Sequence, residues 1–207
     1  TGNPNAQLGY FFTDSAKEAS RYASGWGKAN GNVMPVYLAL KNPYQMPYKE
    51  FDGMAMAAFR SLQSDPEYDP NAVVKFGDME GQKRAAERLP KHEDAAKAQA
   101  LARRAELIAE GYDGVMAKVG GVVEYVVFDS TQIKSAIGNN GAFDPANPDI
   151  RYSSRSKTDT PSFRRWFGSS EAVNADGSPM VLYHGTGADI AVFDPKRTTS
   201  IDGIFTT

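Results

Sequence analysis

The chain has 207 residues, of which 41% are hydrophobic and 11% aromatic, as in globular rather than disordered proteins. Its formal net charge of −2 gives no reason to expect nucleic-acid binding through a basic surface. With no cysteine and only two histidines, we exclude disulfides and thiolate nucleophiles and expect no metal site. No signal peptide and no membrane-spanning run of roughly 18 apolar residues is found, so we expect a cytoplasmic location in the producing or target cell.

Strand and helix patterns alternate along the chain. In chain order, we predict a strand at 9–13, a helix at 16–23, a strand at 33–40, a helix at 49–63, a helical stretch over 79–110 broken at Pro90, strands at 114–118 and 122–129 joined by Gly120-Gly121, a short helix at 163–167 and a strand at 180–183. Asp14 or Ser15 can cap the first helix, with Glu18 in the capping-box position. Pro35 favours an edge position for the second strand or a place in the first part of that strand.

We expect one domain over residues 1–207, with a helical insertion at 44–110 and a polar linker at 151–162. Within the insertion, Leu101, Ala105 and Ile108 form one apolar stripe at helical spacing. Either the outer face of this insertion is solvated, which is the simpler interpretation, or it binds a partner.

Glu124 lies in a predicted strand whose two faces are both mainly apolar. Its carboxyl group is therefore predicted to be at least half buried, and a buried carboxyl needs partners. Two interpretations remain open: a functional carboxylate, or an inward-pointing charge that protects an edge strand.

His184 ends an apolar strand and is followed at once by Gly185 and Thr186. A glycine at this point would let a ligand approach the backbone closely. The alternative is a core histidine bonded to a neighbouring residue.

Three segments together carry a family resemblance: Tyr183-His184-Gly185-Thr186, Gly9 to Asp14 with Tyr22 downstream, and Glu124 to Asp129. They resemble the three motifs of the ADP-ribosyltransferase branch that includes poly(ADP-ribose) polymerases and diphtheria toxin. The resemblance is closest to the ADP-ribosyltransferase domains of polyvalent proteins of phages and mobile elements. It implies an α+β fold of two packed, mainly antiparallel sheets with surrounding helices and an NAD+ cleft between the sheets.

The order of the motifs differs from that of the family, in which the histidine motif comes first. Reading residues 163–207 before residues 1–150 restores the family order, so we interpret the chain as circularly permuted. The alternative is a segment that spans parts of two tandem copies.

The resemblance implies that NAD+ is a co-substrate and that Glu124 and His184 are catalytic. Glu124 would bind the 2′-hydroxyl of the ribose next to nicotinamide and face its anomeric carbon, and His184 would hydrogen-bond the ribose. We therefore expect both side chains to reach one cleft.

The other implied residues bind nicotinamide. The Gly185 backbone would bond the carboxamide, supported by Thr186, and Phe11 and Tyr22 would sandwich the ring. Phe11 stands where the family has tyrosine and so lacks the hydroxyl group, while Tyr10, one place earlier, is a further cofactor-binding candidate.

The implied function is mono-ADP-ribosyl transfer from NAD+ to a macromolecule, a protein or a nucleic acid, by a monomer that contacts no membrane. Val122 occupies the position where arginine-modifying enzymes often carry a second Glu or Gln, which argues against arginine as the acceptor. The alternatives are an NAD+ glycohydrolase and an inactive module that binds NAD or ADP-ribose.

Overall fold

The computed structural model describes residues 7–24, 31–55, 57, 79–137, 146, 149–150, 158–186 and 190–193. The elements that follow lie within these residues. The strands are β1 (Tyr10–Thr13), β2 (Asn32–Leu38), β3 (Pro43–Gln45), β4 (Gly114–Val119), β5 (Val122–Val127), β6 (Ile133–Ser135) and β7 (Leu182–Thr186). The helices are α1 (Ala16–Ser24), α2 (Tyr48–Ala55), α5 (Met79–Ala109), the 3₁₀ helix η2 (Ser130–Gln132) and α6 (Pro161–Phe167).

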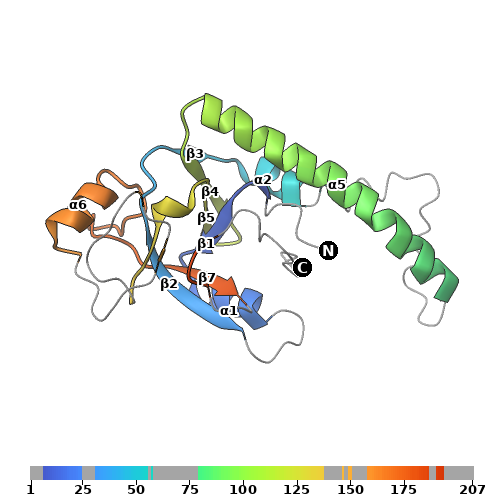
Figure 1. Ribbon diagram of the computed structural model, residues 1–207, viewed down its shortest axis with the longest axis horizontal. Helices are drawn as coiled ribbons and strands as arrows, with labels where there is room; N and C mark the ends of the chain where they lie inside the picture. Colours follow the sequence, from blue (N-terminus) through green and yellow to red (C-terminus); the bar gives the residue numbers. More distant parts are fainter. Residues whose placement is uncertain are drawn as a thin grey trace.

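All seven strands join in one mixed sheet with the order β3-β4-β5-β1-β7-β2-β6 (Figure 1). Only β3 and β4 run parallel, and the other neighbours are antiparallel. The mixed α and β composition is as expected, whereas the expectation of two packed sheets is not confirmed. The junction between β1 and β7 carries a single register pair, Thr13 with Tyr183, although β7 forms five pairs with β2.

Strand alternation divides the core between the two faces of the sheet. Tyr10, Phe12 and Leu182 point to one face, where Ile150 and Phe193 from irregular segments cover them. The opposite face packs against the helices in three places. There, β4 and β5 residues meet α2 and α5, Tyr37 of β2 meets the aromatic residues of α6, and α1 packs against β7. Helices gathered on one face of a mainly antiparallel sheet are typical of α+β domains.

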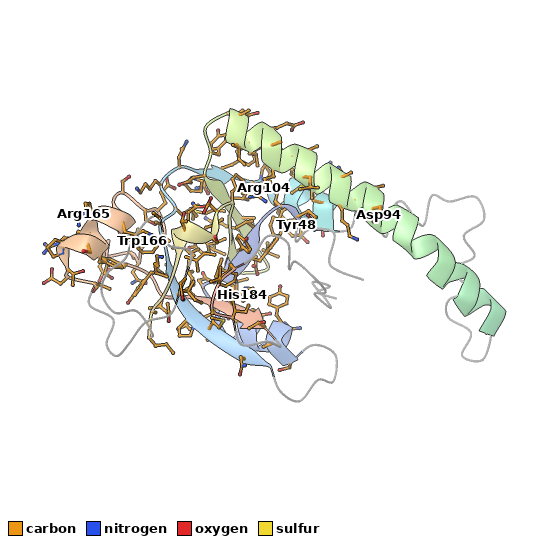
Figure 2. The ribbon with its side chains drawn as sticks, in the orientation of Figure 1. Tyr48, Asp94, Arg104, Arg165, Trp166 and His184 are labelled. Carbon is orange, nitrogen blue, oxygen red and sulfur yellow. The ribbon has the colours of Figure 1, made fainter. Side chains whose placement is uncertain are left out.

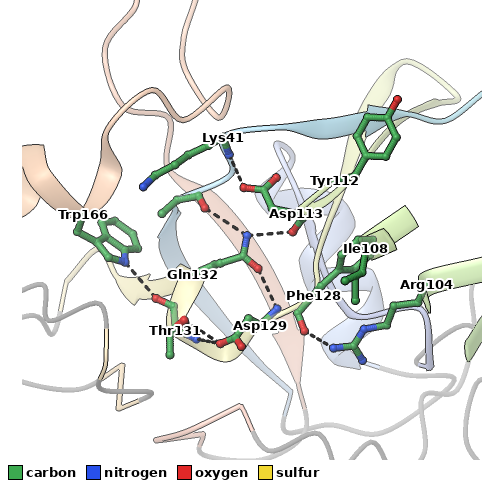
Figure 3. A pocket seen from close by; sticks show the side chains of 11 residues that line it. Lys41, Arg104, Ile108, Tyr112, Asp113, Phe128, Asp129, Thr131, Gln132 and Trp166 are labelled. Atoms are coloured by element: carbon green, nitrogen blue, oxygen red, sulfur yellow. Dashed lines mark hydrogen bonds between the residues drawn. The ribbon is translucent and has the colours of Figure 1, made fainter. Parts of the chain in front are cut away.

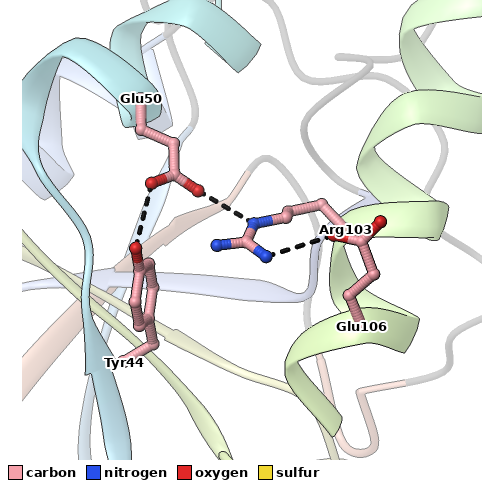
Figure 4. Close-up of polar contacts among 4 residues, drawn as sticks. All are labelled: Tyr44, Glu50, Arg103 and Glu106. Atoms are coloured by element: carbon pink, nitrogen blue, oxygen red, sulfur yellow. Dashed lines mark hydrogen bonds and ion pairs between the residues drawn. The ribbon is translucent and has the colours of Figure 1, made fainter. Parts of the chain in front are cut away.

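Helix α5 extends well beyond the sheet (Figure 1) and is held at its C-terminal half. There, Arg103 of α5 donates to Glu50 of α2 at 2.8 Å and to Glu106 at 3.1 Å, while Tyr44 donates to Glu50 at 3.1 Å (Figure 4). The guanidinium also lies over the Tyr44 ring, 5.2 Å from its centroid. This cluster joins the insertion to the edge of the sheet.

Several sequence expectations are confirmed. Strands β1 and β2, helix α1 and helix α6 lie where they were predicted, and Gly120 and Gly121 turn between β4 and β5 with φ of 54° and 93°. The N–H of Glu18 donates to Ser15 Oγ at 3.3 Å, as a cap by Ser15 requires. The C-terminal part of the predicted 49–63 helix and residues 151–157 of the predicted linker lie outside the described residues.

One expectation about α5 is wrong. The helix runs from Met79 to Ala109 without a break at Pro90, because good helix formers surround the proline on both sides. The stripe of Leu101, Ala105 and Ile108 is exposed, whereas Ala96, Ala100 and Leu107 are buried among the described side chains of the helix. Ala100 and Leu107 pack against the core that includes α2, and Arg103 adds an ion pair to Glu50 of that helix.

Strands at the edges of the sheet also depart from expectation. The three-residue strands β3 and β6 were not predicted, and β2 is an inner strand despite Pro35. The Pro35 carbonyl accepts the N–H of Ala136 at 2.9 Å, so this residue turns its backbone toward the end of β6. The missing N–H of proline therefore falls where the β2–β6 ladder has ended.

Ser170 ties the segment before β7 to the end of β2. Its hydroxyl donates to Leu38 O at 2.7 Å and accepts from the N–H groups of Leu40 at 3.0 Å and Ala172 at 3.3 Å. The side chain is 6% exposed, so Ser170→Ala leaves three buried backbone groups without this partner. We expect the free energy of unfolding to fall by about 1–3 kcal/mol in a denaturant titration.

The matched control is Ser20→Ala, which removes an exposed hydroxyl that bonds only the backbone of its own helix. We expect this variant to unfold like the wild type or slightly later, because alanine is the better helix former. Equal effects of the two substitutions would contradict the role given to Ser170.

Candidate active site

Glu124 is a buried carboxyl group near the centre of the sheet. It lies on β5 between Thr13 of β1 and Ala117 of β4, and only 4% of its surface is exposed. Among the described residues, none forms a hydrogen bond or an ion pair with this carboxyl. Burial, and then the negative charges of Asp14 and Glu18, raise the pKa of Glu124 to about 8. The prediction of a buried carboxyl is therefore confirmed, without the partners that such a group needs.

Helix α1 brings Tyr22 to the same face as Glu124. Burial, and then the negative charge of Glu124, raise the pKa of the Tyr22 phenol above its ordinary value. Tyr22 is half-buried, so its ring combines a packed side with an accessible one. The structure thus brings together two of the residues that the sequence analysis selected.

Gly185 makes this approach of α1 possible. A Cβ atom at Gly185 would lie 2.1 Å from the Ala19 carbonyl oxygen and 3.0 Å from Tyr22 Cβ, so only glycine lets β7 pack this closely against α1. The sequence analysis expected this glycine to admit a ligand. In the structure, the space that a side chain would take is filled by α1.

Phe11 shares the face of Glu124 but is directed toward α2. Its ring centroid lies 6.2 Å from that of Phe51, and the side chain is half-buried against the core beneath α2 and α5. Phe11 therefore packs on Phe51, and among the described residues its ring makes no stacking contact with Tyr22.

His184 points to the opposite face of the sheet. Its ring packs against Phe12 and Phe193, with centroids at 5.4 and 5.0 Å, and it lies well apart from Trp166 on α6 (Figure 2). Strand alternation places Thr186 on the same side as His184. The structure thus does not bring His184 and Glu124 together on one face.

Tyr10 also belongs to the face of His184. Its hydroxyl donates to the Phe193 carbonyl at 3.0 Å, its ring meets that of Phe193 edge-on, and the side chain is buried. This residue fills the core beneath His184.

The protonation of His184 follows from its hydrogen bond. Nδ1 lies 2.8 Å from the Phe11 carbonyl oxygen, which can only accept, so Nδ1 carries the proton and donates. Burial lowers the pKa of His184, and the bond to Phe11 raises it, with burial the larger effect. The ring is therefore neutral near pH 7, and its Nε2 is a hydrogen-bond acceptor. The same bond fastens β7 to β1 beside their single register pair.

Two charged residues beside Glu124 were not selected as site residues. Asp14 was interpreted as the last residue of one motif and a possible helix cap, and Glu18 as a capping-box residue, yet both raise the pKa of Glu124. The sequence offered one signal for Asp14, since it directly follows Thr13 in the strand. That signal has value only once the pairing of Thr13 with Glu124 is known.

A separate pocket of about 470 Å³ lies at the other end of β5 (Figure 3). Its floor is a closed hydrogen-bond network around Gln132, whose amide donates to the carbonyls of Ala39 and Asp113 and accepts from the N–H of Asp129. The pocket is lined by Ala39, Lys41, Arg104, Ile108, Tyr112, Asp113, Phe128, Asp129, Thr131, Gln132 and Trp166. None of the predicted site residues lines it.

Within the residues that the structure describes, no group of three or more acidic, histidine or cysteine side chains is placed to hold a metal ion. Likewise, none of the helices within these residues combines the length and apolar character needed to cross a membrane.

The buried Glu124 predicts an unusual dependence of stability on pH. Its pKa is about 8 in the folded protein against 4.5 as the ordinary value, so the folded state binds the proton more tightly. Between these values the unfolded state holds fewer protons, and the free energy of unfolding falls as pH rises. The loss is at most about 1.4 kcal/mol per pH unit.

We therefore expect Glu124→Gln, which cannot ionise, to lack this loss. Denaturant titrations at several values between pH 5 and pH 8 should show the stability of the variant rising relative to that of the wild type. Parallel pH dependences for the two proteins would show that Glu124 ionises normally.

Comparison with known proteins agrees with the resemblance of the motifs. The model of the family described as ADP-ribosyltransferase in polyvalent proteins matches residues 1–143, which include β1, α1 and β5. Curated proteins and solved structures give no match to the chain. Because the matched segment covers more than half of the sequence, the chain belongs to the family of ADP-ribosyltransferases in polyvalent proteins.

Proposed function

We propose that this protein cleaves NAD+ between nicotinamide and ribose and transfers the ADP-ribose unit to a macromolecule as a mono-ADP-ribosyltransferase. Its family transfers ADP-ribose, with NAD+ as substrate. The observation that carries the assignment of the site is the Glu124 carboxyl, 4% exposed and beside Tyr22. A fold tolerates a buried acid without a described partner only at considerable cost, and functional sites are where such groups gather.

The chemistry needs one carboxylate and no general acid. When the bond between ribose C1′ and the nicotinamide nitrogen breaks, its electron pair goes to nitrogen, and the cationic ring leaves as neutral nicotinamide. Positive charge then builds on the sugar, as in glycoside cleavage. The nucleophile of the acceptor bonds to C1′ and its proton goes to solvent. Glu124, once ionised, supplies negative charge in apolar surroundings, where it stabilises the sugar cation most.

The face that carries Glu124 supplies the other groups for the nicotinamide end. Tyr22 offers a half-buried ring, and the carboxylates of Asp14 and Glu18 make this face favourable for a cationic ring. Gly185 contributes indirectly, since its missing side chain is what lets α1 carry Tyr22 to this place.

We assign two roles to His184. Its bond to Phe11 supports the β1–β7 junction on which Glu124 depends, and its Nε2 can accept a hydrogen bond from a ribose hydroxyl. His184 and Glu124 point to opposite faces of the sheet. One ribose can therefore contact both side chains only beyond the single β1–β7 pair, where the two strands separate.

We also propose that the domain is circularly permuted, which accounts for the order of its motifs. Strand β7, which carries the histidine motif, lies outside the matched residues 1–143 yet is paired between β1 and β2. Of the linker 151–162, which would join the two ends of the family sequence, residues 151–157 lie outside the described residues.

The test is nicotinamide release from NAD+ by the wild type and by Glu124→Gln, with and without a cell lysate as the source of acceptor. We expect release by the wild type and a loss on the order of 10²–10³ in rate for the variant, because the sugar cation loses its carboxylate. With NAD+ labelled in its adenine ring, we expect label on lysate macromolecules.

Glu110→Gln is the matched control, since it removes an exposed carboxyl at the end of α5 and should leave the rate unchanged. Nicotinamide release without transfer of label to macromolecules would mean that the protein is an NAD+ glycohydrolase and not a transferase. If the folded wild type binds NAD+ but releases no nicotinamide, the protein is an inactive NAD-binding module.

A further inference from the structure

Asp14 binds the backbone next to Glu124. The N–H of Asp14 donates to the Val123 carbonyl at 3.3 Å, and the N–H of Val123 donates to Asp14 Oδ1 at 3.2 Å. These two bonds continue the β1–β5 ladder by one step beyond the pair of Thr13 with Glu124. The residue that precedes Glu124 is therefore held by a main-chain bond and by a charge-assisted bond.

The Asp14 carboxylate is not needed to begin α1. Ser15 performs that task, because its Oγ accepts the N–H of Glu18 at 3.3 Å. The N–H of Ser15 is taken by the Thr13 hydroxyl, also at 3.3 Å. The side chain of Asp14 is thus turned away from the helix and toward β5.

The charged groups around Glu124 are mostly acidic. Around it are Asp14 after β1, Glu18 and Tyr22 on α1, and Tyr183 of β7, which pairs with Thr13. The guanidinium of Arg21 forms an ion pair with the Glu18 carboxylate, with 2.9 Å between nitrogen and oxygen.

The cationic groups on the neighbouring strands lie elsewhere. On β4, the residue paired with Glu124 is Ala117, and Lys118 pairs with Val123 and so points to the other face. His184 of β7 lies on that other face as well, with a neutral ring. Among the residues that the structure describes, burial and these two carboxylates raise the pKa of Glu124, and no cationic side chain lowers it.

We propose that Asp14 is a positioning residue for Glu124, which fixes the backbone that carries it and sets the electric field in which its carboxyl group ionises. This inference rests on the proposed function for its effect on catalysis, but not for its effect on Glu124. Asp14 acts at the start of β5 through two separable means, an acceptor oxygen and a negative charge. Removing the charge alone makes Glu124 ionise at lower pH, since burial and Asp14 together raise its pKa.

Two substitutions separate these means. Asp14→Asn retains an acceptor oxygen for the Val123 N–H and loses the charge, whereas Asp14→Ala loses both. Glu18→Gln removes the more weakly acting carboxylate, and Asp94→Asn removes an exposed carboxylate on α5, far from His184 in Figure 2, as the matched control.

The first measurement is the titration of the Glu124 carboxyl carbon by NMR in protein labelled with ¹³C-glutamate, assigned by its absence in Glu124→Gln. We expect the midpoint to fall in Asp14→Asn, to fall less in Glu18→Gln and to stay unchanged in Asp94→Asn. An unchanged midpoint in a folded Asp14→Asn would overturn the inference, whether or not the protein cleaves NAD+.

The second measurement is the pH profile of nicotinamide release. At subsaturating NAD+ the rate follows the ionisation of Glu124 in the free protein, so Asp14→Asn should move the rising limb of the profile to lower pH. If the midpoint falls from about 8 to about 7, the rate at pH 7, relative to the same variant's rate at high pH, rises about fivefold. Asp14→Ala should also lower the rate at high pH, because the backbone before Glu124 is no longer held.

These two readouts separate the possible failures. A shifted NMR midpoint with no cleavage by any variant contradicts the proposed function and supports the role of Asp14. Cleavage with an unshifted midpoint and an unshifted pH profile contradicts the role of Asp14 and leaves the proposed function intact.

Discussion

The position of β1 between β5 and β7 is the constraint on which the candidate site depends. Through Thr13, β1 pairs with Glu124 on one side and with Tyr183 on the other. The first pairing buries the carboxyl in the middle of the sheet, and the second brings β7 and α1 beside it. Any shift of register by one residue would move Glu124 to the other face, away from Tyr22.

The burial of Glu124 has a large electrostatic cost. Moving a carboxylate out of water without a partner disfavours its charged form, and nearby Asp14 and Glu18 add to the effect. The protein reduces this cost by holding a proton on Glu124 near pH 7. A cationic nicotinamide ring on the same face would reverse the balance, because it supplies the positive charge that this face lacks. The same field that destabilises the free carboxylate would then favour the substrate.

Local patterns in the sequence were sufficient for part of this account. The apolar residues on both sides of Glu124 indicated its burial, and Gly120-Gly121 indicated the hairpin that presents it. The family resemblance, confirmed over residues 1–143, then gave the class of chemistry. These features depend on neighbours in the chain, which a single sequence shows directly.

The rest depends on contacts between distant segments. The register of β1 with β7 decides that His184 points away from Glu124, and nothing within the histidine motif indicates it. In the same way, Gly185 admits α1 rather than a ligand. The three-residue strands β3 and β6 are too short to give a periodic pattern, and the face of α5 that packs on the core carries Ala100 and Leu107 rather than the apolar stripe.

The most direct test of this account is to follow the ¹³C resonance of the Glu124 carboxyl at pH 7 while a non-cleavable NAD+ analogue is added. The account predicts a protonated carboxyl in the free protein and an ionised one in the complex, with a proton released to solvent. A carboxyl that is already ionised in the free protein, or that stays protonated when the analogue is bound, would contradict it.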